Sequence, residues 1–262
     1  MDEVGRQVQL ENRIGASIYT QRQLPAREGD QAMLGFGLNR YNYPDQHASD
    51  RLLLEGDWEY WQSLPGDRRQ LRYRVEAAHA LDPGERVFSR LRAGMAWRTG
   101  TAPRQLLQAR VRVGYRDQDE ANTFAGYDQY ELLGELNYSW QSRDWRWYLL
   151  GTLYVEERFA DNDIYSYTQR GARLLTRYRL NESTRAFWRL SGFGRDYRSG
   201  GRDDTRLRST LGVEHWLSER TRVEVYAGFE SNRSNQRNKD YDGNVFGLSL
   251  HYTWPWCKSC QQ

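Results

Sequence analysis

The sequence predicts an all-β fold, namely a transmembrane antiparallel up-and-down β-barrel. First, apolar and polar residues alternate at every second position along almost the whole chain, which is typical of strands with two unlike faces. Second, the alternating segments run for about 10–16 residues, whereas strands in soluble proteins average about 5–6. Third, the connections between segments alternate between short turns and longer polar loops, as in barrels that cross a membrane.

Composition excludes two other classes of protein. The chain has 262 residues, of which 38% are hydrophobic and 28% charged, with a mean hydropathy of −0.94. No apolar run approaches the roughly 18 residues that a spanning helix needs. The 10 Trp, 18 Tyr and 8 Phe argue against disorder, because disordered segments contain few aromatic residues. The net charge of +3 is nearly balanced, so the overall charge says little about a partner. No nucleic-acid partner is expected.

Periodicity predicts about thirteen strands and no helix. We count them near residues 7–20, 31–43, 50–63, 68–81, 85–99, 104–117, 126–141, 145–159, 165–180, 184–198, 204–217, 221–232 and 243–254.

Six of these segments carry the assignment most clearly. The first, 70–81, reads QLRYRVEAAHAL. In 105–116, one row reads LAVVY and the other QRRGR, and in 145–158 one row reads WWLGLV and the other RYLTYER. Segment 205–217 sets leucines and valine against arginines and glutamate, and 223–230 sets VVAF against acidic residues and tyrosine. In 245–254, the row FLLYW opposes glycine, serine and histidine.

The connections predict which end of the barrel is which. LPGD, SRD, LNES and LSER are short, whereas DQDEANTFAGYD, ADNDI, RSGGRDD and NRSNQRNKDYDGN are longer and polar. Outer-membrane barrels have short periplasmic turns and longer external loops.

The alternative to a transmembrane barrel is a large soluble β-protein. A propeller would show a blade repeat, which is absent, and a soluble barrel would hold its apolar row inside.

We therefore expect the apolar row to face lipid and the charged row to face a lumen. The sheet must close, because unpaired backbone groups are costly in hydrocarbon. Aromatic residues near strand ends suit the girdles at the membrane interfaces. They are Trp58, Tyr60, Trp97, Tyr138, Trp140, Trp145, Trp147, Tyr252 and Trp254.

Bacterial single-chain barrels have an even number of strands. Thirteen strands would start outside and end in the periplasm, so we expect a further strand, missed in the count or upstream of Met1. The prediction is about 14 strands, with 12–16 as the range.

The final third of the chain resembles the end of a Gram-negative outer-membrane barrel. The resemblance lies in residues 177–254, through NRSNQRNKDYDGN and VFGLSLHYTW. In style it is similar to barrels of exopolysaccharide secretion machinery, which often follow tetratricopeptide repeats. Through NRSN and DYDGN it is also similar to surface-lipoprotein translocators. It departs after Trp254, where PWCKSCQQ follows the aromatic residue that usually ends such chains.

The resemblance implies an envelope pore in the bacterial outer membrane. No signal peptide is visible in MDEVGRQVQL, so residues 1–254 are expected to form the barrel domain of a longer protein, and 255–262 a short tail. The expected partners are outer-membrane lipid, an exported polymer and periplasmic or inner-membrane export machinery.

No catalytic or metal site is predicted. Cys257 and Cys260 form a lone CxxC, which supplies only two of the four ligands that zinc needs. The four histidines, His47, His79, His215 and His251, are scattered. No GxSxG, HExxH or phosphate loop occurs, so we expect neither an enzyme nor a cofactor.

The inward charges are the candidate lumen path. One basic wall comprises Arg72, Arg74, Arg90, Arg92, Arg98, Arg110, Arg112 and Arg116, and a second comprises Arg173, Arg177, Arg179, Arg185, Arg189, Arg195, Arg206 and Arg208. The inward acids are Glu55, Asp57, Glu59, Glu131, Glu135, Glu224 and Glu230. Two interpretations remain open: ion pairs that stiffen the barrel, or a path that selects charged solutes.

Three functions fit a pore of this kind. The first is a conduit for an exported polymer, expected to be an extracellular polysaccharide. The second is a translocator of surface lipoproteins or other proteins, and the third is a passive diffusion porin or a surface barrel that mediates adhesion.

Overall fold

The computed structural model describes residues 14–42, 51–65, 68–82, 85–119, 128–236 and 239–252. They form thirteen strands. The strands are β1 (Ile14–Leu24), β2 (Gln31–Asn42), β3 (Arg51–Ser63), β4 (Arg69–Asp82), β5 (Glu85–Ala102), β6 (Gln105–Gln118), β7 (Gln129–Gln141), β8 (Trp147–Ala160), β9 (Tyr167–Arg179), β10 (Thr184–Tyr197), β11 (Asp203–Trp216), β12 (Thr221–Ser234) and β13 (Tyr241–Tyr252).

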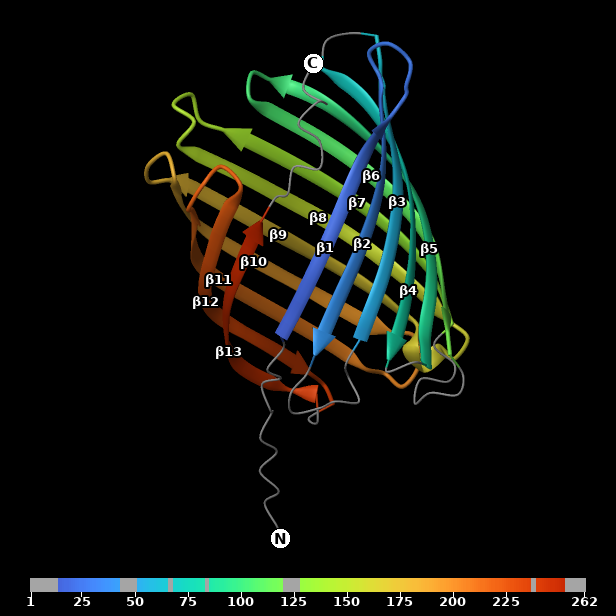
Figure 1. Cartoon of the computed structure of the whole chain (residues 1–262). Helices are drawn as coiled ribbons and strands as arrows, with labels where there is room; N and C mark the ends of the chain where they lie inside the picture. Colours follow the sequence, from blue (N-terminus) through green and yellow to red (C-terminus); the bar gives the residue numbers. More distant parts are fainter. Residues whose placement is uncertain are drawn as a thin grey trace.

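The strands follow one another in a single antiparallel sheet, each hydrogen-bonded to its neighbours in sequence. The sheet curls into a barrel with strongly tilted strands (Figure 1). Twelve of the predicted segments match a strand to within a few residues. The exception is the first, predicted at 7–20 and observed at Ile14–Leu24, with residues 7–13 outside the described part of the chain.

The two rows of each strand face opposite sides, as predicted. In β6, Val111 and Val113 are 54% and 53% exposed, whereas Arg110 and Arg112, at the alternate positions, are partly buried. Arg92 of β5 reaches Glu131 of β7 across the intervening strand. Side chains two strands apart meet on the concave face of a curved sheet. The charged row is therefore the inner face, and the apolar row covers the outside.

The even-numbered strands end at one rim of the barrel, which we call the long-loop rim, and the odd-numbered strands end at the other, the short-turn rim. The widest spacing is at the long-loop rim, where β6 ends at Gln118 and β7 begins at Gln129. The predicted alternation is not strict. β4 ends at Asp82 and β5 begins at Glu85 at that same rim, and β1 ends at Leu24 and β2 begins at Gln31 at the short-turn rim.

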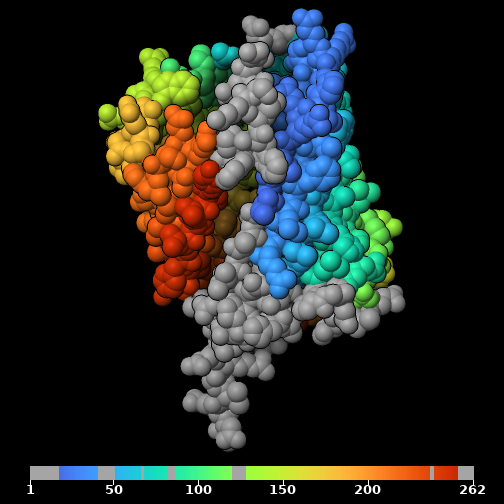
Figure 2. Space-filling view, viewed as in Figure 1, coloured from blue at the N-terminus to red at the C-terminus, as the bar shows by residue number. Residues whose placement is uncertain are grey.

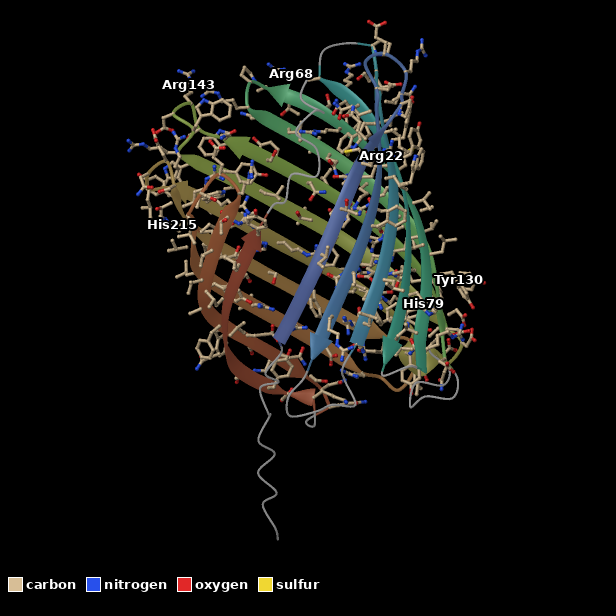
Figure 3. The ribbon with its side chains drawn as sticks, viewed as in Figure 1. Arg22, Arg68, His79, Tyr130, Arg143 and His215 are labelled. Atoms are coloured by element: carbon tan, nitrogen blue, oxygen red, sulfur yellow. The ribbon has the colours of Figure 1, made fainter. Side chains whose placement is uncertain are left out.

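Aromatic side chains gather at both rims. All the aromatic residues predicted for the girdles except Trp254, which lies outside the described residues, are near the short-turn rim. Trp145 and Trp147 there are 53% and 46% exposed. At the long-loop rim, where Figure 3 labels Tyr130, the rings of Tyr115 and Tyr130 lie 4.9 Å apart, and Phe159 is also exposed. This arrangement matches two membrane interfaces.

Turns at the short-turn rim are held by carboxylates. Asp30 accepts hydrogen bonds from the Tyr60 hydroxyl at 2.6 Å and the Ser63 amide at 2.8 Å, which hold the pKa of Asp30 below its ordinary value. Asp144 accepts from the Ser142 hydroxyl at 2.5 Å and the Arg146 amide at 3.2 Å, and its pKa is lowered likewise. These bonds fix the short connections between long strands.

The first and last strands, β1 and β13, run in the same direction, because the antiparallel sheet of described residues has an odd number of strands. They border the same side of the barrel (Figures 1 and 2). In the described part of the chain, β1 pairs only with β2, and β13 only with β12. Residues 1–13 and 253–262 are outside that part, so the additional strand stays a prediction.

Helix contributes almost nothing to the residues described. The 3₁₀ turn η2 (Asp163–Tyr165) lies between β8 and β9. None of the described residues forms a helix of the length and apolarity required to cross a membrane.

Candidate functional site in the barrel lumen

The predicted lumen residues all lie on inward rows of their strands. Arg72 and Arg74 come from β4, Arg90 and Arg92 from β5, and Arg110 and Arg112 from β6. The remaining members are Glu131 and Glu135 on β7, Arg173 and Arg177 on β9, Arg189 on β10, Arg206 and Arg208 on β11, and Glu224 on β12. What the structure adds is which of these charges meet.

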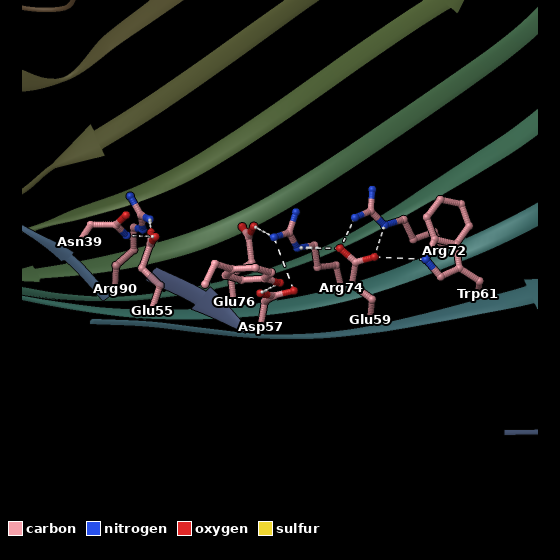
Figure 4. Close-up of polar contacts among 10 residues, drawn as sticks. Asn39, Glu55, Asp57, Glu59, Trp61, Arg72, Arg74, Glu76 and Arg90 are labelled. Atoms are coloured by element: carbon pink, nitrogen blue, oxygen red, sulfur yellow. Dashed lines mark hydrogen bonds and ion pairs between the residues drawn. The ribbon is translucent and has the colours of Figure 1, made fainter. Parts of the chain in front are cut away.

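The first group of ion pairs joins β3 and β4 (Figure 4). Glu59 pairs with Arg72 and lies 3.3 Å from Arg74, and Arg74 also lies 3.6 Å from Asp57 and 3.0 Å from Glu76. These charges form one chain of alternating sign, in which the acids predicted on β3 pair with two of the eight arginines of the first basic wall.

The rest of that wall is paired in part. Arg90 lies 3.8 Å from Glu55, which also accepts a hydrogen bond from Asn39 at 2.8 Å. Arg92 lies 2.5 Å from Glu131, and Arg110 lies 2.6 Å from Glu135. The side chains of Glu131 and Glu135 are only 4% and 7% exposed. They therefore depend on their arginines for compensation.

A third group occupies the opposite wall. Arg177 lies 3.3 Å from Glu214, whose side chain is 1% exposed. Arg189 binds Glu224 with two hydrogen bonds of 2.8 and 3.0 Å, and Arg206 and Arg208 lie 2.6 and 3.6 Å from Glu230. The predicted alternative of a lumen stiffened by ion pairs therefore describes much of both walls.

Several inward arginines have no carboxylate within 4.0 Å among the described residues. Six of them, all members of the predicted basic walls, are Arg98, Arg112, Arg116, Arg173, Arg185 and Arg195.

Five of these six arginines lie over an aromatic ring. The carbon of each guanidinium is within 6 Å of a ring centroid, which is the range of a cation–π contact. The pairs are Arg98 on Trp61 at 5.8 Å, Arg116 on Phe88 at 4.0 Å, Arg173 on Tyr154 at 4.4 Å, Arg185 on Trp216 at 4.5 Å and Arg195 on Tyr167 at 4.2 Å.

Stacking positions a guanidinium without cancelling its charge. An aromatic ring covers one face of the guanidinium, whereas a carboxylate occupies its N–H edge and neutralises its charge.

The six arginines are spread along the whole lumen. Arg98 and Arg185 lie toward the short-turn rim, Arg112 and Arg173 lie at mid-strand, and Arg116 and Arg195 lie toward the long-loop rim. They form a series of positive charges from one rim to the other, which we call the arginine track.

Several cavities open on this inner face. One, of about 500 Å³, lies at mid-barrel against Thr152, Arg173, Arg189, Arg208 and Tyr226. Another, of about 730 Å³, lies at the long-loop rim.

No group of three His, Cys, Asp or Glu side chains within the described ranges could hold a metal ion. His79 and His215 lie at opposite ends of the barrel (Figure 3). His47, Cys257 and Cys260 are outside the described residues.

Sequence reasoning missed the aromatic partners and a set of glutamines. Gln118, Gln129 and Gln169 are 3%, 4% and 6% exposed and accept hydrogen bonds from Arg116, Arg158 and Arg195. The spacing Arg-x-Gln at residues 116–118 is visible in the sequence, since alternate residues share a face. The other two pairings depend on register between strands and leave no such local signal.

Solved structures with a similar fold are outer-membrane proteins. OmpT of Vibrio cholerae matches with a TM-score of 0.50 and 12% identity, over 92% of this chain and 96% of that one. Its loop L8 deletion mutant matches with a TM-score of 0.52 and 11% identity, over 92% and 98%. An outer membrane channel from Pseudomonas putida F1 has a TM-score of 0.48 and 12% identity, over 96% and 98%.

No family model and no curated protein matches the sequence. At this level of identity the similarity concerns the fold. With the apolar outer face, the inner charged row and the two aromatic rims, it confirms the prediction of a transmembrane antiparallel β-barrel fold, as in outer-membrane proteins.

Proposed function

We propose that the barrel is a pore of the bacterial outer membrane that prefers anions, and that it is the exit for an acidic polymer, an extracellular polysaccharide. The observation that carries this proposal is the arginine track. A series of uncompensated positive charges along a low-dielectric passage attracts anions and repels cations.

The paired charges have a different part in this proposal. Arg92 with Glu131 and Arg189 with Glu224 are locally neutral, so they contribute rigidity to the wall rather than selectivity. The track, in contrast, keeps guanidinium edges available along the lumen. The acid groups of a flexible anionic chain then transfer from one arginine to the next along the lumen. Such transfer favours passage of the chain over tight binding at one place.

The partners follow from the same proposal. A polymer has to be delivered to the pore from inside the cell, so we propose that the barrel works with periplasmic or inner-membrane export machinery. We further propose that residues 1–254 are the barrel domain of a longer protein.

Ion selectivity tests the pore. In a planar bilayer under a KCl gradient, we expect the reversal potential of the wild-type barrel to indicate a preference for chloride. The double variant Arg112→Gln with Arg173→Gln removes two track charges without removing an ion pair. Its ratio of chloride to potassium permeability should fall by about twofold or more.

The control removes two exposed arginines from short turns, Arg143→Gln with Arg220→Gln. It should leave the reversal potential unchanged. Equal effects of the two double variants would assign selectivity to overall charge and contradict a role for the track. Block of the current by dextran sulfate, but not by neutral dextran of the same length, supports a polymer conduit. Lack of block would favour a porin for small anions.

A further inference from the structure

The cavity at the long-loop rim is unusual in its charge. Its lining includes six cationic side chains and no Asp or Glu. The cations are Arg51, Arg116, Arg158, Arg195, Arg202 and Lys239. Two of them are neutralised by acids beyond the lining, because Arg158 lies 2.7 Å from Glu156 and Arg202 lies 2.5 Å from Asp204. Arg116 and Arg195 have no such acid in the described part of the chain.

Neutral glutamines hold the arginines of this cavity. The Nε of Arg116 donates to Oε1 of Gln118 at 3.0 Å. Arg195 donates from Nε and Nη2 to Oε1 of Gln169 at 3.0 and 2.6 Å. Guanidinium groups only donate hydrogen bonds, so they require the amide oxygen in each pair. Gln169 also donates from Nε2 to the Tyr154 hydroxyl at 3.0 Å, which fixes the orientation of its amide.

Elsewhere in the lumen, a carboxylate rather than a glutamine accepts the hydrogen bond from the guanidinium. Glu131 receives Arg92, Glu135 receives Arg110, and Glu224 receives Arg189. A buried glutamine positions a guanidinium as a glutamate does, but it leaves the positive charge unbalanced. Keeping such a charge partly buried is costly unless an anion arrives.

Aromatic rings complete the wall. Arg195 lies 4.2 Å from the centroid of Tyr167, whose ring meets that of Tyr197 at 5.6 Å edge to face. Tyr167 is 7% exposed, so it is a fixed support. Arg195 also donates from Nη1 to the Tyr197 hydroxyl at 3.1 Å. Arg116 uses only Nε in the contacts described, so both of its Nη groups are available to an anion.

We propose that this cavity is a binding site for an oxyanion, with Arg116 and Arg195 as its ligands and Tyr167 and Tyr197 as its aromatic wall. The proposal rests on the proposed function and names its recognition step. The acid group is a carboxylate, sulfate or phosphate, carried by a sugar unit of the polymer or supplied as a free inorganic anion. Tyrosine faces beside paired arginines suit a sugar ring that bears such a group.

Isosteric variants test the site without altering its packing. The first, which we call the mouth variant, is Gln118→Glu with Gln169→Glu. Its two carboxylates would pair with Arg116 and Arg195 and neutralise the charge that attracts a ligand. The matched control is Gln70→Glu with Gln141→Glu, which adds the same two charges on inward rows at the short-turn rim. Migration of unheated samples on gels shows whether each variant folds. Arg116→Gln provides a second test that does not rely on added acid.

The readout is block of the current through single barrels in a bilayer. The probes are trigalacturonate, neutral maltotriose and sodium sulfate, each added to either side. We expect trigalacturonate to block the wild type at concentrations at which maltotriose does not. In the mouth variant and in Arg116→Gln, its apparent affinity should fall about tenfold or more, which is about 1.4 kcal/mol. The control should stay near the wild-type value.

Sulfate distinguishes the source of the oxyanion. Competition by sulfate at concentrations similar to those of trigalacturonate supports a site for free anions, whereas block by the sugar acid alone supports a polymer unit. Equal loss of block in the mouth variant and the control, or no block of the wild type, would overturn the site. A wild-type barrel that prefers chloride but lacks this block would retain the proposed function and lose only the site.

Discussion

Replacing Leu211 by Arg on the outer face should prevent most of the protein from folding into a bilayer. Leu211 lies near the middle of β11 and is 64% exposed, beside Trp188 and Ala227 on the neighbouring strands. An arginine facing lipid near the bilayer midplane costs about 2–4 kcal/mol in a transmembrane barrel. The folded fraction in lipid vesicles, measured by gel migration of unheated samples, reports the effect.

The matched variant places arginine on the other face at the same height. Tyr226 of β12 pairs with Gly212, one residue along from Leu211, and its side chain lines the mid-barrel cavity. Tyr226→Arg should therefore fold nearly as well as the wild type. Similar folded fractions for the two variants would show that the two faces have been assigned wrongly.

Removing Arg92 should cause a large loss of stability. The side chains of Arg92 and Glu131 are 12% and 4% exposed, and the two atoms of the pair lie 2.5 Å apart. Breaking a buried pair from one side costs about 3–5 kcal/mol, and we expect the lower end because water reaches the lumen. The midpoint of urea unfolding in vesicles should fall accordingly for Arg92→Gln.

Two further variants separate pairing from charge. Arg112→Gln removes an arginine that has no carboxylate partner in the described residues, so it should cost less than about 1 kcal/mol. Adding Glu131→Gln to Arg92→Gln should recover much of the lost stability, because the double variant no longer buries an unpaired carboxylate. A cost for Arg112→Gln as large as that for Arg92→Gln would contradict this account of the ion pairs.

The fold could be predicted closely from the sequence for a physical reason. Lipid on one side and water on the other impose a strict alternation, and Val111 to Tyr115 or Phe246 to Tyr252 display it without interruption. The first strand was placed less well, because the row Ile14, Ala16, Ile18 and Thr20 is only weakly apolar.

The candidate site could be predicted only in part. The alternation of residues along each strand assigns Arg112 and Arg92 to the inner face. It does not show that Arg92 has a carboxylate partner whereas Arg112 has none among the described residues. That difference depends on register, since Glu131 stands beside Arg158 and Gly114 on neighbouring strands and reaches Arg92 beyond them. The aromatic partners likewise come from other strands in several cases, such as Tyr154 beneath Arg173.

The odd number of described strands places the two ends of the sheet on opposite sides of the membrane. β1 begins at the long-loop rim, and β13 ends at the short-turn rim. If the short turns face the periplasm, a domain fused directly before β1 is displayed on the cell surface, where added protease can reach it. A fused periplasmic domain would require one more crossing of the membrane between it and Ile14.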